Sequence, residues 1–99
     1  MFENIRDKMR ELIRSLEYVM TIHGEEEIEN DKLSILDIEN TVLTGEIVER
    51  QRDDATAESK YLIVGKTLDD TDVTVVAKLG LTGKLVIITV YREDDEYEN

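Results

Sequence analysis

The fold is decided by residues 85–91, which read Leu-Val-Ile-Ile-Thr-Val-Tyr. β-branched and aromatic residues are typical of strands, and this run is apolar on both of its alternating faces. Such a strand is expected to lie inside a sheet or to be covered on both sides. Strict alternation divides its side chains between two faces, with Leu85, Ile87, Thr89 and Tyr91 on one and Val86, Ile88 and Val90 on the other.

Three more strands are expected upstream of this run. Residues 46–52 are polar and typical of an edge strand, whereas residues 60–66 and 73–79 contain β-branched runs. The connecting segments are short, namely 53–58, 68–72 and 80–83. Because a parallel crossover needs a dozen or more residues, these strands are predicted to form antiparallel hairpins.

Helical periodicity marks the amino-terminal half. Residues 3–17 are predicted to form an amphipathic helix whose apolar face consists of Ile5, Met9, Leu12, Ile13 and Leu16. A second helix is predicted over residues 35–43, where Ser34 and Asp37 form a capping box and Gly45 ends the helix in the left-handed conformation. We therefore expect an α+β fold in which two helices pack on a roughly four-stranded antiparallel sheet, within one domain of residues 1–92.

Three segments remain. Two of them allow more than one structural interpretation, and the third is an acidic terminal segment. Residues 18–23 are compatible with a brief edge strand or with the end of the first helix. Residues 25–31 are mostly acidic and are compatible with a turn of helix or an irregular segment. Residues 93–99 contain five acids and are predicted to form a disordered acidic tail.

Composition narrows the classes of function. The chain has 99 residues, no cysteine, one histidine and a formal net charge of −12. One core fits this length, and the lack of cysteine argues against thiolate metal sites, so no metal or cofactor is expected. No apolar run is long enough to cross a bilayer, and a cytoplasmic protein without membrane contact is expected.

The acidic charge is concentrated in one segment. Residues 17–58 carry thirteen acidic and three basic residues. Such a field repels phosphate backbones and favours a basic protein partner. The same acids are about equally typical of a solvated surface, so the charge leaves both interpretations open.

Several short strings, in this order and spacing, resemble the small toxin-like family called domain of unknown function 4258. The strings are Ile5-Arg6, Tyr18 to His23, Ser34 to Glu39, Gly45 to Glu49, Tyr61 to Gly65, Val73 to Val76 and Leu85 to Arg92. That family resembles the RelE, MqsR and BrnT group of bacterial toxins, so the resemblance implies a RelE-like fold and a metal-independent endoribonuclease that cleaves messenger RNA. It also implies a small antitoxin partner of the zinc-finger or DNA-binding type, with no DNA binding by this chain on its own.

The resemblance directs attention to five residues. The candidate catalytic residues are His23, Tyr91 and Arg92, and the candidate RNA-binding residues are Arg50 and Lys60. Histidine suits proton transfer near neutral pH, while a tyrosine beside an arginine can stack on a base and hold a phosphate. Each residue also has a structural interpretation: His23 would join two elements by a hydrogen bond, Tyr91 would close the core, and the basic residues would protect a sheet edge.

The chain departs from the family pattern where the family carries an alanine, basic groups and a second histidine. Gly24, Glu27-Ile28, Asp31 and Thr74 occupy those positions here. Three polar or basic groups that could hold RNA are therefore replaced. The alternative prediction is a non-catalytic protein-interaction domain on the same scaffold, with a degenerate RNA site.

Overall fold

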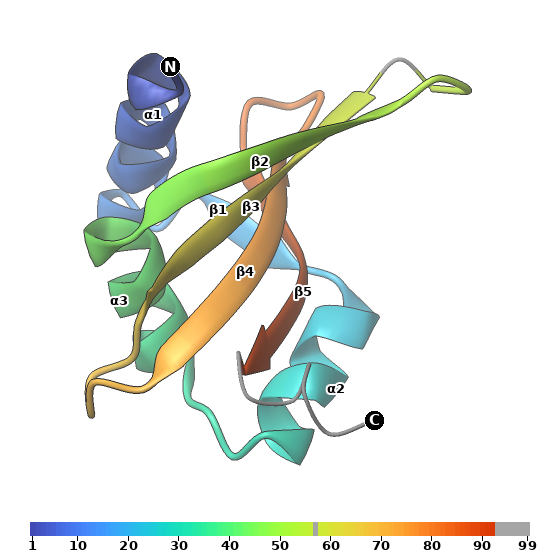
Figure 1. Ribbon diagram of the computed structural model, residues 1–99. Helices are drawn as coiled ribbons and strands as arrows, with labels where there is room; N and C mark the ends of the chain where they lie inside the picture. Colours follow the sequence, from blue (N-terminus) through green and yellow to red (C-terminus); the bar gives the residue numbers. More distant parts are fainter. Residues whose placement is uncertain (57, 93–99) are drawn as a thin grey trace.

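The computed structural model describes residues 1–56 and 58–92, which form three helices and one five-stranded sheet (Figure 1). In chain order the elements are α1 (Glu3–Arg14), β1 (Tyr18–Met20), α2 (Ile22–Asn30), α3 (Ile35–Thr44), β2 (Glu46–Asp53), β3 (Glu58–Lys66), β4 (Asp72–Leu79) and β5 (Leu85–Arg92). The α+β class is confirmed, but the expected two helices and four strands are too few. The predicted acidic tail, 93–99, lies outside the described residues. Over the described ranges, no helix combines the length and the apolar character needed to span a membrane.

The sheet has the strand order β1-β5-β4-β3-β2. Strands β2 to β5 pair antiparallel, as predicted. The unexpected strand is β1, which pairs with β5 in parallel and places Tyr18 opposite Leu85 and Met20 opposite Ile87. The sequence of residues 18–23 is compatible with an edge strand or with the end of the first helix, and the first three of them form this strand. β5 consequently lies inside the sheet, as its apolar sequence predicts.

A bulge in β5 changes which of its side chains face the core. Ala77 of β4 lies opposite Ile87, but its neighbour Val76 lies opposite Thr89, so Ile88 is an extra residue. The fully buried core side chains of this strand are Leu85, Ile87 and Val90. The strict alternation predicted for residues 85–91 is therefore wrong after Ile87, because one extra residue reverses the face to which the following side chains point.

Helix α1 ends in a Schellman motif that contains no glycine. The amide of Leu16 donates to the carbonyl of Ile13 at 3.1 Å, and the amide of Glu17 donates to that of Leu12 at 2.8 Å. Leu16 adopts the left-handed conformation with φ 59°, and it is 71% exposed. The helix therefore ends at Arg14 and not at residue 17, and Leu16 does not belong to the buried face.

The other two helices differ from expectation at their ends. Helix α2 ends in the same way as α1. Lys32 adopts the left-handed conformation with φ 56°, and the amide of Leu33 donates to the carbonyl of Ile28 at 2.9 Å. The acidic segment 25–31 thus belongs mainly to a complete helix. Ser34 and Asp37 form the predicted capping box of α3. Gly45 is extended, with φ −88° and ψ 179°, because the chain passes directly from α3 into β2.

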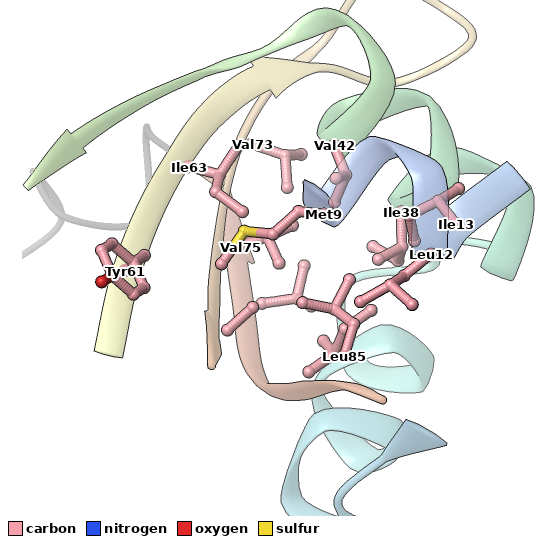
Figure 2. Close-up of a cluster of buried hydrophobic side chains, with 13 residues drawn as sticks. Met9, Leu12, Ile13, Ile38, Val42, Tyr61, Ile63, Val73, Val75 and Leu85 are labelled. Carbon is pink, nitrogen blue, oxygen red and sulfur yellow. The ribbon is translucent and has the colours of Figure 1, made fainter. Parts of the chain in front are cut away.

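The core lies between the sheet and the helices α1 and α3 (Figure 2). It consists of Met9, Leu12 and Ile13 from α1, Ile38 and Val42 from α3, and Tyr61, Ile63, Val73, Val75, Ala77, Leu85, Ile87 and Val90 from the sheet. The predicted covering of the sheet by the amino-terminal helices is confirmed for Met9 and Leu12. Burial of these apolar side chains is the main term that stabilises the fold.

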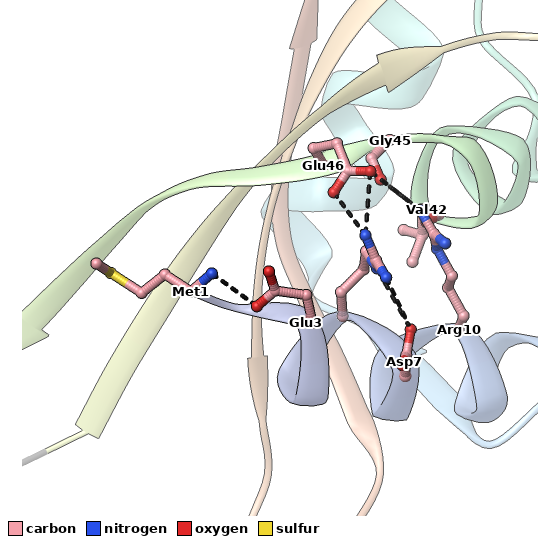
Figure 3. A network of polar contacts seen from close by, with 8 residues as sticks. Met1, Glu3, Asp7, Arg10, Val42, Gly45 and Glu46 are labelled. Atoms are coloured by element: carbon pink, nitrogen blue, oxygen red, sulfur yellow. Dashed lines mark hydrogen bonds and ion pairs between the residues drawn. The ribbon is translucent and has the colours of Figure 1, made fainter.

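Two arginines anchor α1 to the junction of α3 and β2 (Figure 3). Arg10 donates from Nη2 to the carbonyl of Gly45 at 2.6 Å and from Nε to that of Val42 at 3.3 Å. Arg6 forms an ion pair with Glu46 at 3.0 Å. The side chains of Arg6 and Arg10 are 25% and 18% exposed, so both guanidinium groups are engaged in contacts within the protein.

Candidate functional site

Helix α2 is fixed along the edge of β5 at the point where β1 ends. The amide of Thr21 donates to the carbonyl of Ile87 at 3.0 Å, and its hydroxyl donates to the carbonyl of Ile88 at 2.7 Å. The same hydroxyl caps the helix by accepting from the amide of Gly24 at 3.0 Å. Gly24 is buried, and a Cβ atom there would lie 3.3 Å from the Ile87 carbonyl oxygen. One threonine therefore both starts α2 and holds it against the sheet.

His23 lies in the first turn of α2, and its side chain is 63% exposed. Its Nε2 atom lies 3.6 Å from Oε1 of Glu27, one turn further along the same helix. This contact stays within α2, so it does not join two elements as the structural interpretation of His23 proposed. An exposed histidine with a carboxylate beside it can exchange a proton with a ligand or with solvent.

Arg92 lies at the other end of α2. Its Nη2 and Nε atoms donate to the backbone carbonyl of Asp31, the C-cap of α2, at 2.7 and 3.2 Å. A cation is favoured there because carbonyl groups at a helix carboxyl end carry partial negative charge. The nine residues of α2 span about 13 Å at 1.5 Å per residue. Arg92 and His23 are consequently separated by the length of the helix.

Tyr91 faces the opposite side of the sheet from the core. It lies opposite Thr74, whereas Arg92 lies opposite the core residue Val73. Neighbouring residues of a strand point to opposite faces, so the structure does not direct the side chains of Tyr91 and Arg92 to one point. The sheet face away from the core, called the outer sheet face here, consists of Lys60, Leu62, Val64, Thr74, Val76, Thr89 and Tyr91.

The two candidate RNA-binding residues lie on opposite faces of the β2–β3 hairpin. Lys60 lies opposite Gln51 and belongs to the outer sheet face, whereas Arg50 lies opposite Tyr61, a core residue. Other lysines near the outer sheet face are paired with acids, Lys66 with Asp72 at 2.6 Å and Lys78 with Glu58 at 3.0 Å. Of the five candidates, Tyr91 and Lys60 therefore share the outer sheet face, whereas Arg50 and Arg92 lie on the side of the core.

A groove that sequence reasoning missed lies between α2 and α3. It has a volume of about 290 Å³ and is lined by Met20, Glu25, Ile28, Glu29 and Ile35. Met20 and Ile28 also pack against the core, and Ile35 is 43% exposed. These residues come from β1, α2 and α3, and two of those elements have no definite assignment from the sequence. Only their convergence in three dimensions reveals the groove.

Tyr18 and Glu39 form a contact beside this groove. Tyr18 lies two residues before Met20 on β1, Glu39 lies one turn after Ile35 on α3, and the Tyr18 hydroxyl donates to a carboxylate oxygen of Glu39. Burial, followed by this hydrogen bond and the charge of Glu39, raises the pKa of Tyr18 to about 12. The contact joins β1 to α3 and leaves the tyrosine neutral at physiological pH.

The surface of α2 is strongly acidic. Residues 17–39 contain eight acidic residues and one basic residue. Glu25, Glu26 and Glu29 are exposed, and over residues 1–56 and 58–92 none of the three forms an ion pair. Within the same ranges, no group of three histidine, aspartate or glutamate side chains is arranged to hold a metal ion.

A second cleft, of about 240 Å³, lies at the start of α1 and is lined by Met1, Phe2, Glu3, Arg6, Glu46 and Ile47. Its charged groups pair with one another, the amino terminus with Glu3 at 2.6 Å and Arg6 with Glu46 at 3.0 Å. Such neutralised pairs leave little charge with which to select a ligand.

Comparison with known proteins gives one match. A family model described as Domain of unknown function (DUF4258) matches residues 20–92 of the 99-residue chain. The matched region begins in β1 and includes α2, α3 and β2 to β5. No curated protein and no solved structure matches the chain.

Proposed function

We propose that this chain, which belongs to the family described as Domain of unknown function (DUF4258), is a protein-interaction domain that binds a basic protein partner. The partner that we propose is the small antitoxin of a toxin–antitoxin pair, and the chain is the toxin-like member on a RelE-like scaffold. The observation that carries this proposal is the acidic surface of α2, where Glu25, Glu26 and Glu29 are exposed without ion pairs in the described part of the chain.

The electrostatics favour a basic protein over RNA. The net charge of −12 repels a phosphate backbone at long range and attracts a basic partner, which speeds their encounter. Three of the arginines that could offset this charge are engaged within the fold, Arg6 and Arg10 at the α3–β2 junction and Arg92 at the end of α2.

Affinity purification from the source cells tests this function. The wild-type chain is compared with a Glu25→Gln, Glu26→Gln, Glu29→Gln variant and with a control that loses as many charges on the β2 hairpin, Glu49→Gln, Asp53→Asn, Asp54→Asn. We expect a small basic protein to be retained by the wild type and the control, and to bind the α2 variant at least about tenfold more weakly. The proposal fails if the wild type and the α2 variant retain the same proteins in the same amounts.

RNA cleavage is the second candidate function. Tyr91 and Lys60 support it by sharing the outer sheet face, where Lys60 lies four residues along β3 from Val64, the residue in register with Tyr91. A tyrosine can stack on an unpaired base or donate a proton, and a lysine can hold the phosphate. In this candidate His23, Tyr91 and Arg92 carry the chemistry, while Arg50 and Lys60 hold the RNA. Within the described ranges, Lys60 forms no ion pair that would have to break first.

Incubation with messenger RNA in the presence of EDTA tests the second candidate, since the reaction needs no metal. If it is right, His23→Ala and Tyr91→Phe each lower the cleavage rate at least about tenfold. Ile22→Ala is the matched control, because Ile22 is the neighbour of His23 and is 76% exposed. An intact RNA together with no RNA binding at low salt excludes this candidate and leaves the interaction domain.

A further inference from the structure

We infer that the groove between α2 and α3 is the docking site for an amphipathic helix of the partner, with leucine-like anchors on one face and lysine or arginine beside them. This inference rests on the proposed function and names the part of the acidic surface that makes contact. The groove combines two features that such a helix needs, namely an apolar floor and an acidic rim.

The apolar floor consists of Met20, Ile28 and Ile35. Met20 and Ile28 pack against the core on their inner sides, so they cannot turn away from the groove without disturbing the fold. Methionine adapts its shape to different apolar partners, which suits a surface that receives side chains from another chain. Burial of the exposed part of Ile35 by a partner would supply a hydrophobic contribution to binding.

The rim carries one sign of charge. Glu25 and Glu29 lie one turn apart along the α2 wall, and both are exposed. Glu39 of α3 is not part of the lining, and its carboxylate accepts a hydrogen bond from the Tyr18 hydroxyl. A helix with basic residues beside its apolar stripe would place each cation next to a carboxylate.

The size of the groove selects the kind of occupant. At about 290 Å³ it lies just below the range of roughly 300–1,000 Å³ that is typical of sites for drug-sized molecules. An amphipathic helix laid in a groove is anchored by side chains spaced at i and i+4 on one face. A second copy of this chain is disfavoured, because the same acidic rim would face itself in a molecule of net charge −12.

The test uses a defined peptide of about 15 residues in which leucine and lysine alternate at helical spacing. Two peptides of equal length serve as comparisons, one with the same lysines and serine in place of leucine, and one with the same leucines and glutamine in place of lysine. Binding is followed by calorimetry, and backbone amide shifts in the isotope-labelled chain locate the contact. We expect the leucine–lysine peptide to bind most tightly, with shifts concentrated in α2 and α3.

Neighbouring residues of α3 supply a matched pair of variants. Ile35 lines the groove and is 43% exposed, whereas Leu36 is not part of the lining and is 56% exposed. Both lie at the surface, so neither change to serine should unfold the chain. Ile35→Ser is expected to weaken binding by about fivefold or more, and Leu36→Ser by less than about twofold. Glu25→Gln with Glu29→Gln should weaken binding at low salt and have less effect at high salt.

The outcomes separate this inference from the proposed function. If the lysine–serine peptide binds as tightly as the leucine–lysine peptide, or if Ile35→Ser and Leu36→Ser weaken binding equally, the groove is not the docking site. A purely acidic binding surface then remains. Peptide shifts confined to β2 and β3 also overturn it. A chain that sediments as a dimer broken by Ile35→Ser identifies a second copy as the occupant and contradicts the inference. If no basic peptide binds and affinity purification also fails, the proposed function falls as well.

Discussion

The guanidinium group of Arg92 donates two hydrogen bonds to the backbone carbonyl of Asp31, from Nη2 at 2.7 Å and from Nε at 3.2 Å. Strand β5 is thereby joined to the C-cap of α2. Together with Thr21 at the start of the helix, this contact holds α2 along β5 at both ends. Any role of Arg92 in phosphate binding would have to compete with it.

Removal of this contact should destabilise the fold. Arg92→Met keeps the apolar stem and loses both hydrogen bonds, so we expect the free energy of unfolding to fall by about 1–2 kcal/mol. Urea denaturation measures this change, and hydrogen exchange should become faster mainly in α2. Arg52→Met is the control, because Arg52 is exposed on β2. If Arg92→Met left the stability unchanged and lowered the rate of RNA cleavage, Arg92 would instead belong to the RNA site.

Glycine should stabilise the ends of α1 and α2. Leu16 and Lys32 are both left-handed, with φ 59° and 56°, a conformation that costs an L-residue roughly 1–2 kcal/mol. Part of this gain is offset by the greater freedom of glycine in the unfolded chain, so Leu16→Gly and Lys32→Gly should each raise stability by about 0.5–1 kcal/mol. Leu16→Ala, which keeps the left-handed strain, is the control. A loss of stability in both glycine variants would contradict the left-handed assignment.

Gly65 of β3 lies against the end of α3, and a side chain at this position should not be tolerated. A Cβ atom there would lie 2.9 Å from the Cα atom of Gly45, and a Cβ atom on Gly45 would lie 2.5 Å from the Val64 carbonyl oxygen. Backbone must move in either case, so Gly65→Ala should cost at least about 3 kcal/mol. Gly83→Asn is the comparison and should cost less, because a Cβ atom at Gly83 meets nothing and asparagine is the side chain that best tolerates a left-handed φ such as 87°. Thermal unfolding of both variants distinguishes the two positions.

Tyr18 should ionise later than an ordinary tyrosine. Burial and the hydrogen bond to Glu39 raise its pKa from 10.0 to about 12. Because the folded pKa lies above the unfolded one, this contribution to stability is complete below pH 10 and is lost as the pH rises toward 12. Absorbance titration should show a late phase near pH 12 that Tyr18→Phe removes, while circular dichroism reports whether the chain is still folded. A late phase that persists in Tyr18→Phe would contradict this assignment.

Patterns short enough to be read locally could be predicted from the sequence. The apolar run 85–91, the antiparallel hairpins and the capping box at Ser34 all follow from residues within a few positions of each other. Met9 and Leu12 are buried as helical periodicity requires. The α+β class follows from these elements, since each depends on local propensity and the two periodicities of apolar residues.

The remaining features depend on residues distant in sequence or lack their usual local signal. β1 is a strand because Tyr18 to Met20 meet the free edge of β5, which is formed more than sixty residues later. The ends of α1 and α2 use Leu16 and Lys32 in a conformation that glycine usually signals. The bulge at Ile88 and the extended Gly45 also depend on neighbouring strands.

The features of the candidate sites also divide into those that the sequence determined and those that depend on the tertiary structure. The sequence determined that the segment around α2 is acidic and that Tyr91 follows an apolar strand. Only the tertiary structure decided that Tyr91 faces away from the core, bound Arg92 to Asp31, and brought Met20, Ile28 and Ile35 together beside the acids. The physical reason is that charge and hydrophobic periodicity belong to the chain itself, whereas a groove or a paired guanidinium exists only after distant backbone segments have packed against one another.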